Sequence, residues 1–168
     1  MRLLILMLCV FPALNCYAAE LAQDSKSPIE ILSDEVRYLD VENKAVFTGD
    51  VIATQDDLVV KSKTMEVFFE KKESKALDGA EKSNVKYIYF NDDVDIRNKA
   101  DHATASKGEY DVAKGIFILR GNVVLEQAGS VLTGDELVHI KATGESLLKS
   151  NNKSKRVKAH IVQKGKEK

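Results

Sequence analysis

The sequence predicts an all-β protein, a long folded-over sheet built from repeated antiparallel hairpin units. Three observations carry this prediction. Apolar and polar residues alternate with a period of two along most of the chain, and turn-forming clusters separate the apolar runs at the intervals of a β-meander. In addition, one strand-like phrase occurs twice, as FTGDVIATQ and as LRGNVVLEQ.

The N-terminus is predicted to be a secretory signal peptide covering residues 1–18. A charged start precedes the apolar run LLILMLCVFPAL, and small residues follow at a cleavage site after Ala18 or Ala19. The run of about twelve residues falls well short of the roughly twenty that a membrane-spanning helix needs. We therefore expect an exported, soluble mature protein. Retention of the run as a membrane anchor and lipidation at Cys16 are the alternatives.

The mature chain is predicted to contain no thiol, because Cys9 and Cys16 both lie before residue 19. Disulfides, thiol catalysis and cysteine metal sites are excluded together. About 150 residues are enough for one domain with a continuous core. We expect a single β-domain over residues 19–162, followed by a basic tail, residues 163–168.

Charge argues against nucleic acid as a partner, because the formal net charge is only −1. The distribution along the chain is less even. From Lys149 onward the sequence is strongly basic, whereas the acidic residues lie mostly upstream. This end is either a solvated tail or a contact with an anionic surface or partner, and the sequence leaves both open.

The two copies of the repeated phrase have the same pattern of faces about 72 positions apart. The apolar face of the first copy consists of Phe47, Gly49, Val51 and Ala53. The apolar face of the second copy consists of Phe117, Leu119, Gly121, Val123 and Leu125. Both copies are therefore predicted to be strands with one buried face.

The segment KTMEVFFEKKESKAL is compatible with a helix as well as with a strand, because its apolar residues also have helical spacing. The repeat favours the strand. The same offset aligns VVKSKTMEVFF with VLTGDELVHIK, whose valine, threonine and isoleucine prefer an extended backbone.

A weaker middle copy of the repeat, over residues 91–110, indicates that similar hairpin units are stacked side by side. Each unit has one apolar face, which it cannot bury alone. Stacked units would form a long folded sheet with an apolar interior. Gly49 and Gly121 lie where such a sheet would bend or bulge.

Catalytic and metal-binding motifs are not found in the sequence. His102, His139 and His160 lack the spacing of metal ligands. The acidic segment NDDVDIRNKADH lacks the glycine and the glutamate that a calcium-binding loop requires at positions six and twelve. We therefore predict no catalytic residues, no metal and no cofactor. A hydrolase with paired carboxylates, for instance Asp34 with Asp50, is the enzymatic alternative.

Three segments of the sequence resemble a known protein family. The segments IEILSDEVRYLDVENKAVFTGDVIATQDDLVVKSKTMEVFF, GEYDVAKGIFILRGNVVLEQAGSVLTGDELVH and SKRVKA are similar, in order and spacing, to the LptA/OstA-like periplasmic family of lipopolysaccharide transport proteins. The resemblance implies an open antiparallel β-jellyroll in the periplasm that carries lipopolysaccharide through its lipid A part. It also implies head-to-tail stacking between an inner-membrane LptC-like protein and an outer-membrane LptD-like protein.

The same resemblance suggests which residues line the lipid groove, and an ordinary core position is the alternative for each. These candidates are Ile29, Ile31, Phe47, Val51, Tyr110, Val112, Phe117, Leu119, Val123 and Leu125. Ile29 and Ile31 are favoured because a terminal strand has fewer neighbours to cover it. The alternative functions are a membrane-anchored LptC-like relative and a protein-interaction scaffold of the same fold.

Overall fold

A computed structural model of the protein describes residues 27–70, 85–151 and 156–162. The predicted signal peptide and the predicted basic tail lie outside these residues. Within them the chain forms a sheet of ten strands and one short 3-10 helix, η1 (Asp40–Glu42). The strands are β1 (Glu30–Leu32), β2 (Glu35–Leu39), β3 (Lys44–Gln55), β4 (Leu58–Phe69), β5 (Val85–Arg97), β6 (Asp101–Asp111), β7 (Ile116–Gln127), β8 (Ser130–Ile140), β9 (Glu145–Lys149) and β10 (Lys158–His160).

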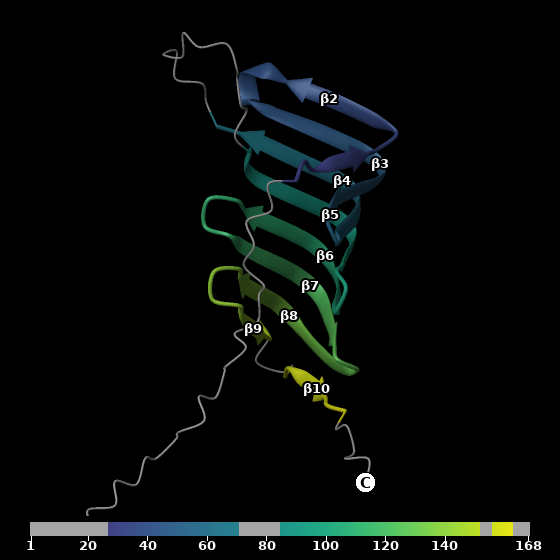
Figure 1. The fold of residues 1–168 in the computed structure, drawn as a ribbon, viewed down its shortest axis with the longest axis vertical. Helices are drawn as coiled ribbons and strands as arrows, with labels where there is room; N and C mark the ends of the chain where they lie inside the picture. The colour runs from purple at the N-terminus through teal and green to yellow at the C-terminus, as the bar shows by residue number, and fades with distance from the viewer. Residues whose placement is uncertain (1–26, 71–84, 152–155, 163–168) are drawn as a thin grey trace, which may run out of the picture.

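The strands follow one another in sequence order along the long axis of the molecule (Figure 1). Neighbouring strands pair antiparallel throughout, and β3 to β8 form a continuous series in which each strand pairs with the next. The two short strands β1 and β2 share β3 as their partner, and β9 and β10 share β8. The predicted all-β antiparallel fold is confirmed. The segment with the helical alternative covers residues 63–77. Its part up to Phe69 belongs to strand β4, so the helical alternative is wrong there, and residues 71–77 lie outside the described residues.

A row of bulges crosses the sheet through the middle of the long strands. In β3, β5 and β7, two consecutive residues adopt left-handed φ values: Gly49 with Asp50, Asp92 with Asp93, and Gly121 with Asn122. The register of each strand with its neighbour shifts at these points. Glycine, aspartate and asparagine are the residues that tolerate this conformation. The bends predicted at Gly49 and Gly121 are therefore confirmed, and the middle copy uses Asp92 in place of glycine.

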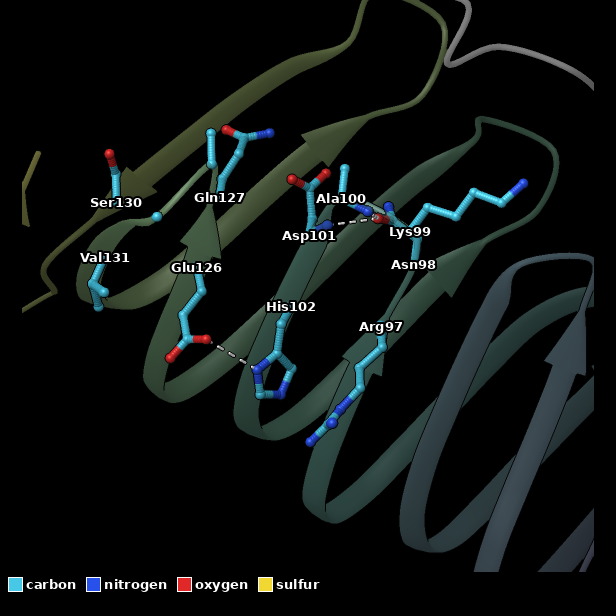
Figure 2. Close-up of a pocket in the computed structure, with 12 residues that line it drawn as sticks. Arg97, Asn98, Lys99, Ala100, Asp101, His102, Glu126, Gln127, Ser130 and Val131 are labelled. Carbon is cyan, nitrogen blue, oxygen red and sulfur yellow. Dashed lines mark hydrogen bonds and ion pairs between the residues drawn. The ribbon is translucent and has the colours of Figure 1, made fainter. Parts of the chain in front are cut away.

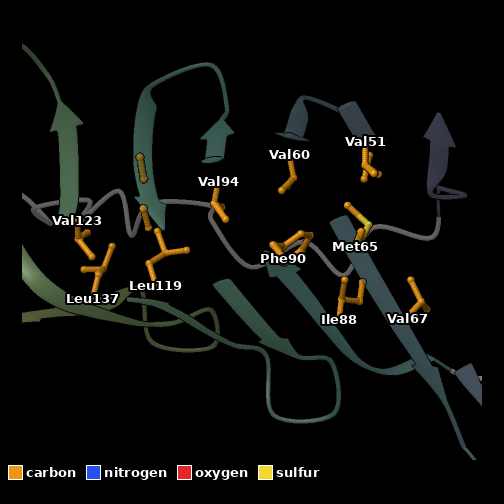
Figure 3. Close-up of a cluster of buried hydrophobic side chains, with 13 residues drawn as sticks. Val51, Val60, Met65, Val67, Ile88, Phe90, Val94, Leu119, Val123 and Leu137 are labelled. Atoms are coloured by element: carbon orange, nitrogen blue, oxygen red, sulfur yellow. The ribbon is translucent and has the colours of Figure 1, made fainter. Parts of the chain in front are cut away.

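This row of bulges, which we call the crease, divides the sheet into two halves. Half A contains β2, β9 and the Lys44–Thr48 part of β3 with its neighbours in the other long strands. Half B contains β1, β10 and the Val51–Gln55 part of β3 with its neighbours. Apolar side chains from both halves join one buried cluster, so the halves face each other across their inner surfaces (Figure 3).

The most deeply buried side chains lie at the crease. Val51, Val94 and Val123 each directly follow one of the left-handed residue pairs, and they are 0%, 1% and 1% exposed. Met65 on β4 is equally buried. Full burial of such a side chain stabilises the fold by about 1.5–3 kcal/mol. The halves are thus closed at the crease, where each side chain has neighbours from both of them.

Candidate functional site

An apolar cavity of about 190 Å³ lies between the two halves, at the end of the sheet that contains β1 to β5. Half B contributes lining residues from β1, β3 and β4, including Ile31 and Val60, and half A contributes Met65 and Phe90 among others. The complete lining comprises Ile29, Ile31, Phe47, Ala53, Thr54, Gln55, Leu58, Val60, Met65, Val67, Phe69, Val85, Ile88, Phe90, Tyr110 and Phe117. Such a surface suits hydrocarbon and offers little to a polar ligand.

The apolar lining continues to the edge of the sheet at β2. Val36 pairs with Phe47 and Tyr38 with Ala45, so both side chains lie on the inner face, because directly opposed residues share one side of a sheet. They are nevertheless 59% and 58% exposed, since no further strand of the described chain follows β2 at this edge. The space between the halves is therefore an open groove with apolar side chains at its mouth.

Two aromatic contacts shape the half A wall of this groove. The rings of Tyr110 on β6 and Phe117 on β7 stack, with centroids 4.0 Å apart and planes 15° apart. Nearer the edge, the ring of Tyr38 lies 6.1 Å from that of Phe69. Aromatic rings give this wall a large apolar area with few rotatable bonds.

The ten residues predicted to line the groove are divided by the structure into three groups. Five of them line the cavity: Ile29, Ile31, Phe47, Tyr110 and Phe117. Four belong to the packed interior: Val51, Leu119 and Val123 are buried in the core cluster, and Leu125 packs against it half-buried. Val112 lies just after β6 and is exposed.

Sequence reasoning missed all of the lining from β4 and β5, and it placed Ala53 of β3 on an apolar face without assigning it to the groove. The missed apolar residues are Ala53, Leu58, Val60, Met65, Val67, Phe69, Val85, Ile88 and Phe90. β4 does alternate between apolar and polar residues. However, its inward-pointing side chains are those of even-numbered residues up to Ser62 and those of odd-numbered residues from Met65 onward. Applying the crease position from the two repeats to this strand would have given the correct face.

Charged side chains on the outer face of half A connect neighbouring strands. Arg120 on β7 bonds Glu109 on β6 at 3.2 Å and Glu136 on β8 at 3.1 Å. Lys149 on β9 bonds the same Glu136 at 2.6 Å, and this hydrogen bond is the main reason that the pKa of Glu136 is lowered. These pairs connect four consecutive strands, β6 to β9.

A polar pocket of about 450 Å³ lies at the hairpin turns near residues 98–101 and 127–131 (Figure 2). His102 faces two carboxylates there, with Nε2 at 3.0 Å from Asp95 and Nδ1 at 3.3 Å from Glu126. Arg97 donates two hydrogen bonds to Asp95, at 2.8 and 3.0 Å. The bonds from Arg97, and then that from His102, lower the pKa of Asp95 to about 2, against the burial that raises it. The stabilisation from this carboxylate is present at neutral pH and is lost progressively as the pH falls from the ordinary pKa of 3.8 to about 2.

The remaining polar residues named in the sequence analysis have different neighbours in the described part of the chain. His139 lies within hydrogen-bond distance of Ser146, and His160 lies on the exposed strand β10. Asp50 is exposed and bonded to Lys63 at 2.7 Å. Among residues 27–70, 85–151 and 156–162, no group of His, Cys, Asp and Glu side chains is arranged to hold a metal ion. Nor does any helix in these ranges have the length and apolarity to cross a membrane.

Comparison with known families gives a match over residues 30–145 to the family described as LptA/(LptD N-terminal domain) LPS transport protein. An uncharacterised protein of Rhizobium meliloti (strain 1021) is 30% identical over 122 residues, which are 72% of this chain and 64% of that protein. The lipopolysaccharide export system protein LptA of Escherichia coli (strain K12) is 29% identical over 142 residues, which are 83% of this chain and 73% of LptA.

Among solved structures, the chain is similar to LptH of Pseudomonas aeruginosa, described as the LptA homologous periplasmic component of the conserved lipopolysaccharide transport device. The TM-score is 0.69, the sequence identity is 18%, and the match covers 83% of this chain and 99% of LptH. At this identity the similarity concerns the fold, and it identifies the creased sheet as the β-jellyroll of LptH.

Proposed function

The chain belongs to the LptA/(LptD N-terminal domain) LPS transport protein family, and on this premise we propose that it is a periplasmic carrier that binds lipopolysaccharide and bridges the inner and outer membranes. The acyl chains of the lipid would lie in the groove between half A and half B. The protein would act as a carrier and not as an enzyme, in keeping with the transport function that the family description gives.

The observation that carries the proposal is the open apolar groove. An acyl chain in water costs about 0.8 kcal/mol for each exposed methylene, so a carrier must shield every chain along its length. The apolar lining, which includes Ile31 and Phe117, offers a surface for such shielding, and the inner-face residues Val36 and Tyr38 continue this apolar surface to the edge of the sheet. Shielding needs no catalytic group.

The dimensions of the cavity suggest that the halves separate when lipid binds. Its volume of about 190 Å³ is below the roughly 300–1,000 Å³ of sites for drug-sized ligands, and lipid A carries several acyl chains. No disulfide can hold the halves together, because residues 19–168 contain no cysteine. We therefore infer that half A and half B move apart about the crease to admit the chains.

Photo-crosslinking tests this proposal directly. A photoreactive amino acid at Ile31 or Phe117, both in the cavity lining, is expected to form an adduct with lipopolysaccharide in the periplasm of the native host. The same substitution at Glu126, which lies on the outer face of β7 beside His102, serves as the control and should give none. Adducts are detected as a mobility shift with an antibody against lipopolysaccharide. Equal adducts at all three positions, or none at any of them, would refute a groove-bound lipid.

Partners in the bridge would add to the two edges of the sheet. The β1 and β2 edge and the β9 and β10 edge close the strand order within the described residues, in agreement with the terminal strands expected there. Edge strands expose backbone donors and acceptors that a further strand can pair with. We propose that one edge meets a second copy or an inner-membrane LptC-like protein, and that the other meets a second copy or an outer-membrane LptD-like protein.

Removing the β10 edge is expected to stop head-to-tail assembly. A variant that ends at Val157 loses the strand that pairs with Val131–Thr133 of β8, and it should remain monomeric at concentrations where the full chain forms oligomers. Size-exclusion chromatography with light scattering measures the difference. A variant that lacks only residues 163–168 is the matched control and should assemble like the full chain. Unchanged assembly of the shorter variant would exclude β10 as the contact.

A further inference from the structure

A second groove lies on the outer face of half A, at the strand ends beside the mouth of the cavity. Its volume is about 760 Å³, which falls within the usual range for small-molecule sites. The lining comprises Glu42, Asn43, Glu66, Phe68, Phe69, Glu70, Lys86, Tyr87 and Tyr89. We refer to it as the outer groove.

Three aromatic side chains form the floor of the outer groove. Phe68 on β4 is directly opposite Tyr87 on β5, and its ring meets that of Tyr89 edge-on at 5.5 Å. The rings of Tyr87 and Tyr89 are 6.4 Å apart. None of the three belongs to the buried core, and all are half-buried on the outer face of the sheet. A surface strand pair with three neighbouring aromatic rings presents ring faces and phenol groups to a ligand.

Both positively and negatively charged side chains surround these rings. Lys44 lies 5.4 Å from the centre of the Phe68 ring and bonds Glu42 at 3.0 Å and Glu66 at 3.2 Å. The ammonium group of Lys86 lies 5.2 Å from the centre of the Tyr87 ring. Carboxylates accept hydrogen bonds from hydroxyl groups, and ammonium groups donate to hydroxyl or acidic oxygens. The groove therefore combines apolar ring faces with several acceptors and a cation.

The outer groove adjoins the apolar cavity at one residue. Phe69 lines both of them, and its partner across the strands, Val85, lines the cavity while the next residue, Lys86, lines the outer groove. A single amphiphilic molecule can therefore reach both surfaces, with its hydrocarbon part inside the sheet and its polar part over the rim.

We propose that the outer groove binds the core oligosaccharide of the same lipopolysaccharide whose acyl chains enter the groove between half A and half B. This inference rests on the proposed function. A pyranose ring has an apolar face of C–H groups and a periphery of hydroxyl groups, which matches aromatic rings bordered by carboxylates and ammonium groups. The outer groove thus adds recognition of the core sugars to the shielding of the chains.

Tyrosine resonances allow the two parts of the lipid to be followed separately, because Tyr87 and Tyr89 lie in the outer groove and Tyr110 lies in the cavity. In protein with ¹³C-labelled tyrosine, delipidated core oligosaccharide is expected to shift the ring signals of Tyr87 and Tyr89 and to leave that of Tyr110 unchanged. Lipid A without core sugars should shift the Tyr110 signal.

Affinities of variants supply the second readout. Replacing Tyr87 and Tyr89 together with leucine removes the ring faces and phenols but keeps apolar volume. This variant should bind rough lipopolysaccharide about threefold to tenfold more weakly than the unaltered chain, with unchanged affinity for lipid A. Ile118→Ala, on the same outer face opposite Glu109 but outside the groove lining, is the matched control and should alter neither affinity.

The two proposals fail in different ways. If lipid A binds normally but the oligosaccharide shifts neither Tyr87 nor Tyr89, the saccharide site is refuted and the carrier function stands. An equal loss of affinity for both lipids in the double variant also refutes the saccharide site. If neither lipid A nor rough lipopolysaccharide binds the unaltered protein, the carrier function is refuted together with the inference that depends on it.

Discussion

Ala53→Phe is expected to reduce the affinity for lipopolysaccharide at least tenfold. Ala53 lies on the inner face of β3 between Ile31 and Val60, and all three side chains line the cavity of about 190 Å³. A phenyl group there occupies space that acyl chains need. Excluding only two methylenes from the groove costs about 1.6 kcal/mol, which already exceeds a factor of ten in affinity. Displacement of a fluorescent lipid by lipopolysaccharide measures the change.

Ile52→Phe is the matched control for this experiment. Ile52 precedes Ala53 on the same strand and pairs with Leu32, so it lies on the outer face and its replacement should leave lipid affinity unchanged. Thermal unfolding of both variants shows whether the added ring disturbs the fold, because overpacking typically costs about 1–3 kcal/mol. Normal lipid binding by a folded Ala53→Phe variant would contradict the assignment of the cavity as the lipid site.

Gly49→Ala is expected to destabilise the fold by about 3 kcal/mol, a large part of the roughly 5–15 kcal/mol that stabilises a typical domain. The φ of Gly49 is +86°, where an L-residue is strained by about 1–2 kcal/mol. An added Cβ would also lie 2.6 Å from the Cβ of Asp34, whose backbone N–H donates to the Thr48 carbonyl oxygen at 3.0 Å. The clash therefore adds to the strain. Urea denaturation gives the difference in unfolding free energy.

Two further variants separate strain from collision. Gly144 has a φ of +68°, and a methyl group added there would meet no atom within 4 Å, so Gly144→Ala should cost only the backbone strain of about 1–2 kcal/mol. Combining Gly49→Ala with Asp34→Gly removes the side chain that the methyl group meets and should recover part of the lost stability. If Gly49→Ala lowers the free energy of unfolding no more than Gly144→Ala does, close packing of Asp34 against the crease is not what requires glycine at position 49.

Much of the fold could be predicted from the sequence because its signals are local. Alternation with a period of two gave the strands, and the repeated Gly-Asp and Gly-Asn pairs gave two of the three bends, since those residues tolerate the left-handed backbone. The middle bend is formed by Asp92 and Asp93, and in the sequence two consecutive aspartates are equally typical of an ordinary turn. Its place in the crease follows only from alignment with the other two.

The site was predicted in part. The expectation that terminal residues would be open to the groove agrees with Ile29 and Ile31 in the cavity lining, although their contact with lipid remains a prediction. The wall formed by Met65, Ile88 and Phe90 was missed because it needs the correct face of β4 and β5. In β4 the inward face changes from even to odd residues at the crease, and no glycine marks that position. In β5 the aromatic residues Tyr87 and Tyr89 lie on the outer face, so residue type alone does not identify its inner face.

By itself, the sequence determined which residues of β3 and β7 point inward, but only the tertiary structure decided which of them line a groove and which fill a core. Val51 and Val123 occupy equivalent places in the repeat, and both are buried because each directly follows a bend, where the halves close on it. Phe47 and Leu119 are equivalent too, yet Leu119 is 3% exposed in the core whereas Phe47 lines the cavity. The difference is their place in the strand order: β7 is flanked by long strands on both sides, whereas β3 is flanked on one side only by the short edge strands β1 and β2. Burial depends on neighbours that come from distant parts of the chain, and a local pattern does not contain them.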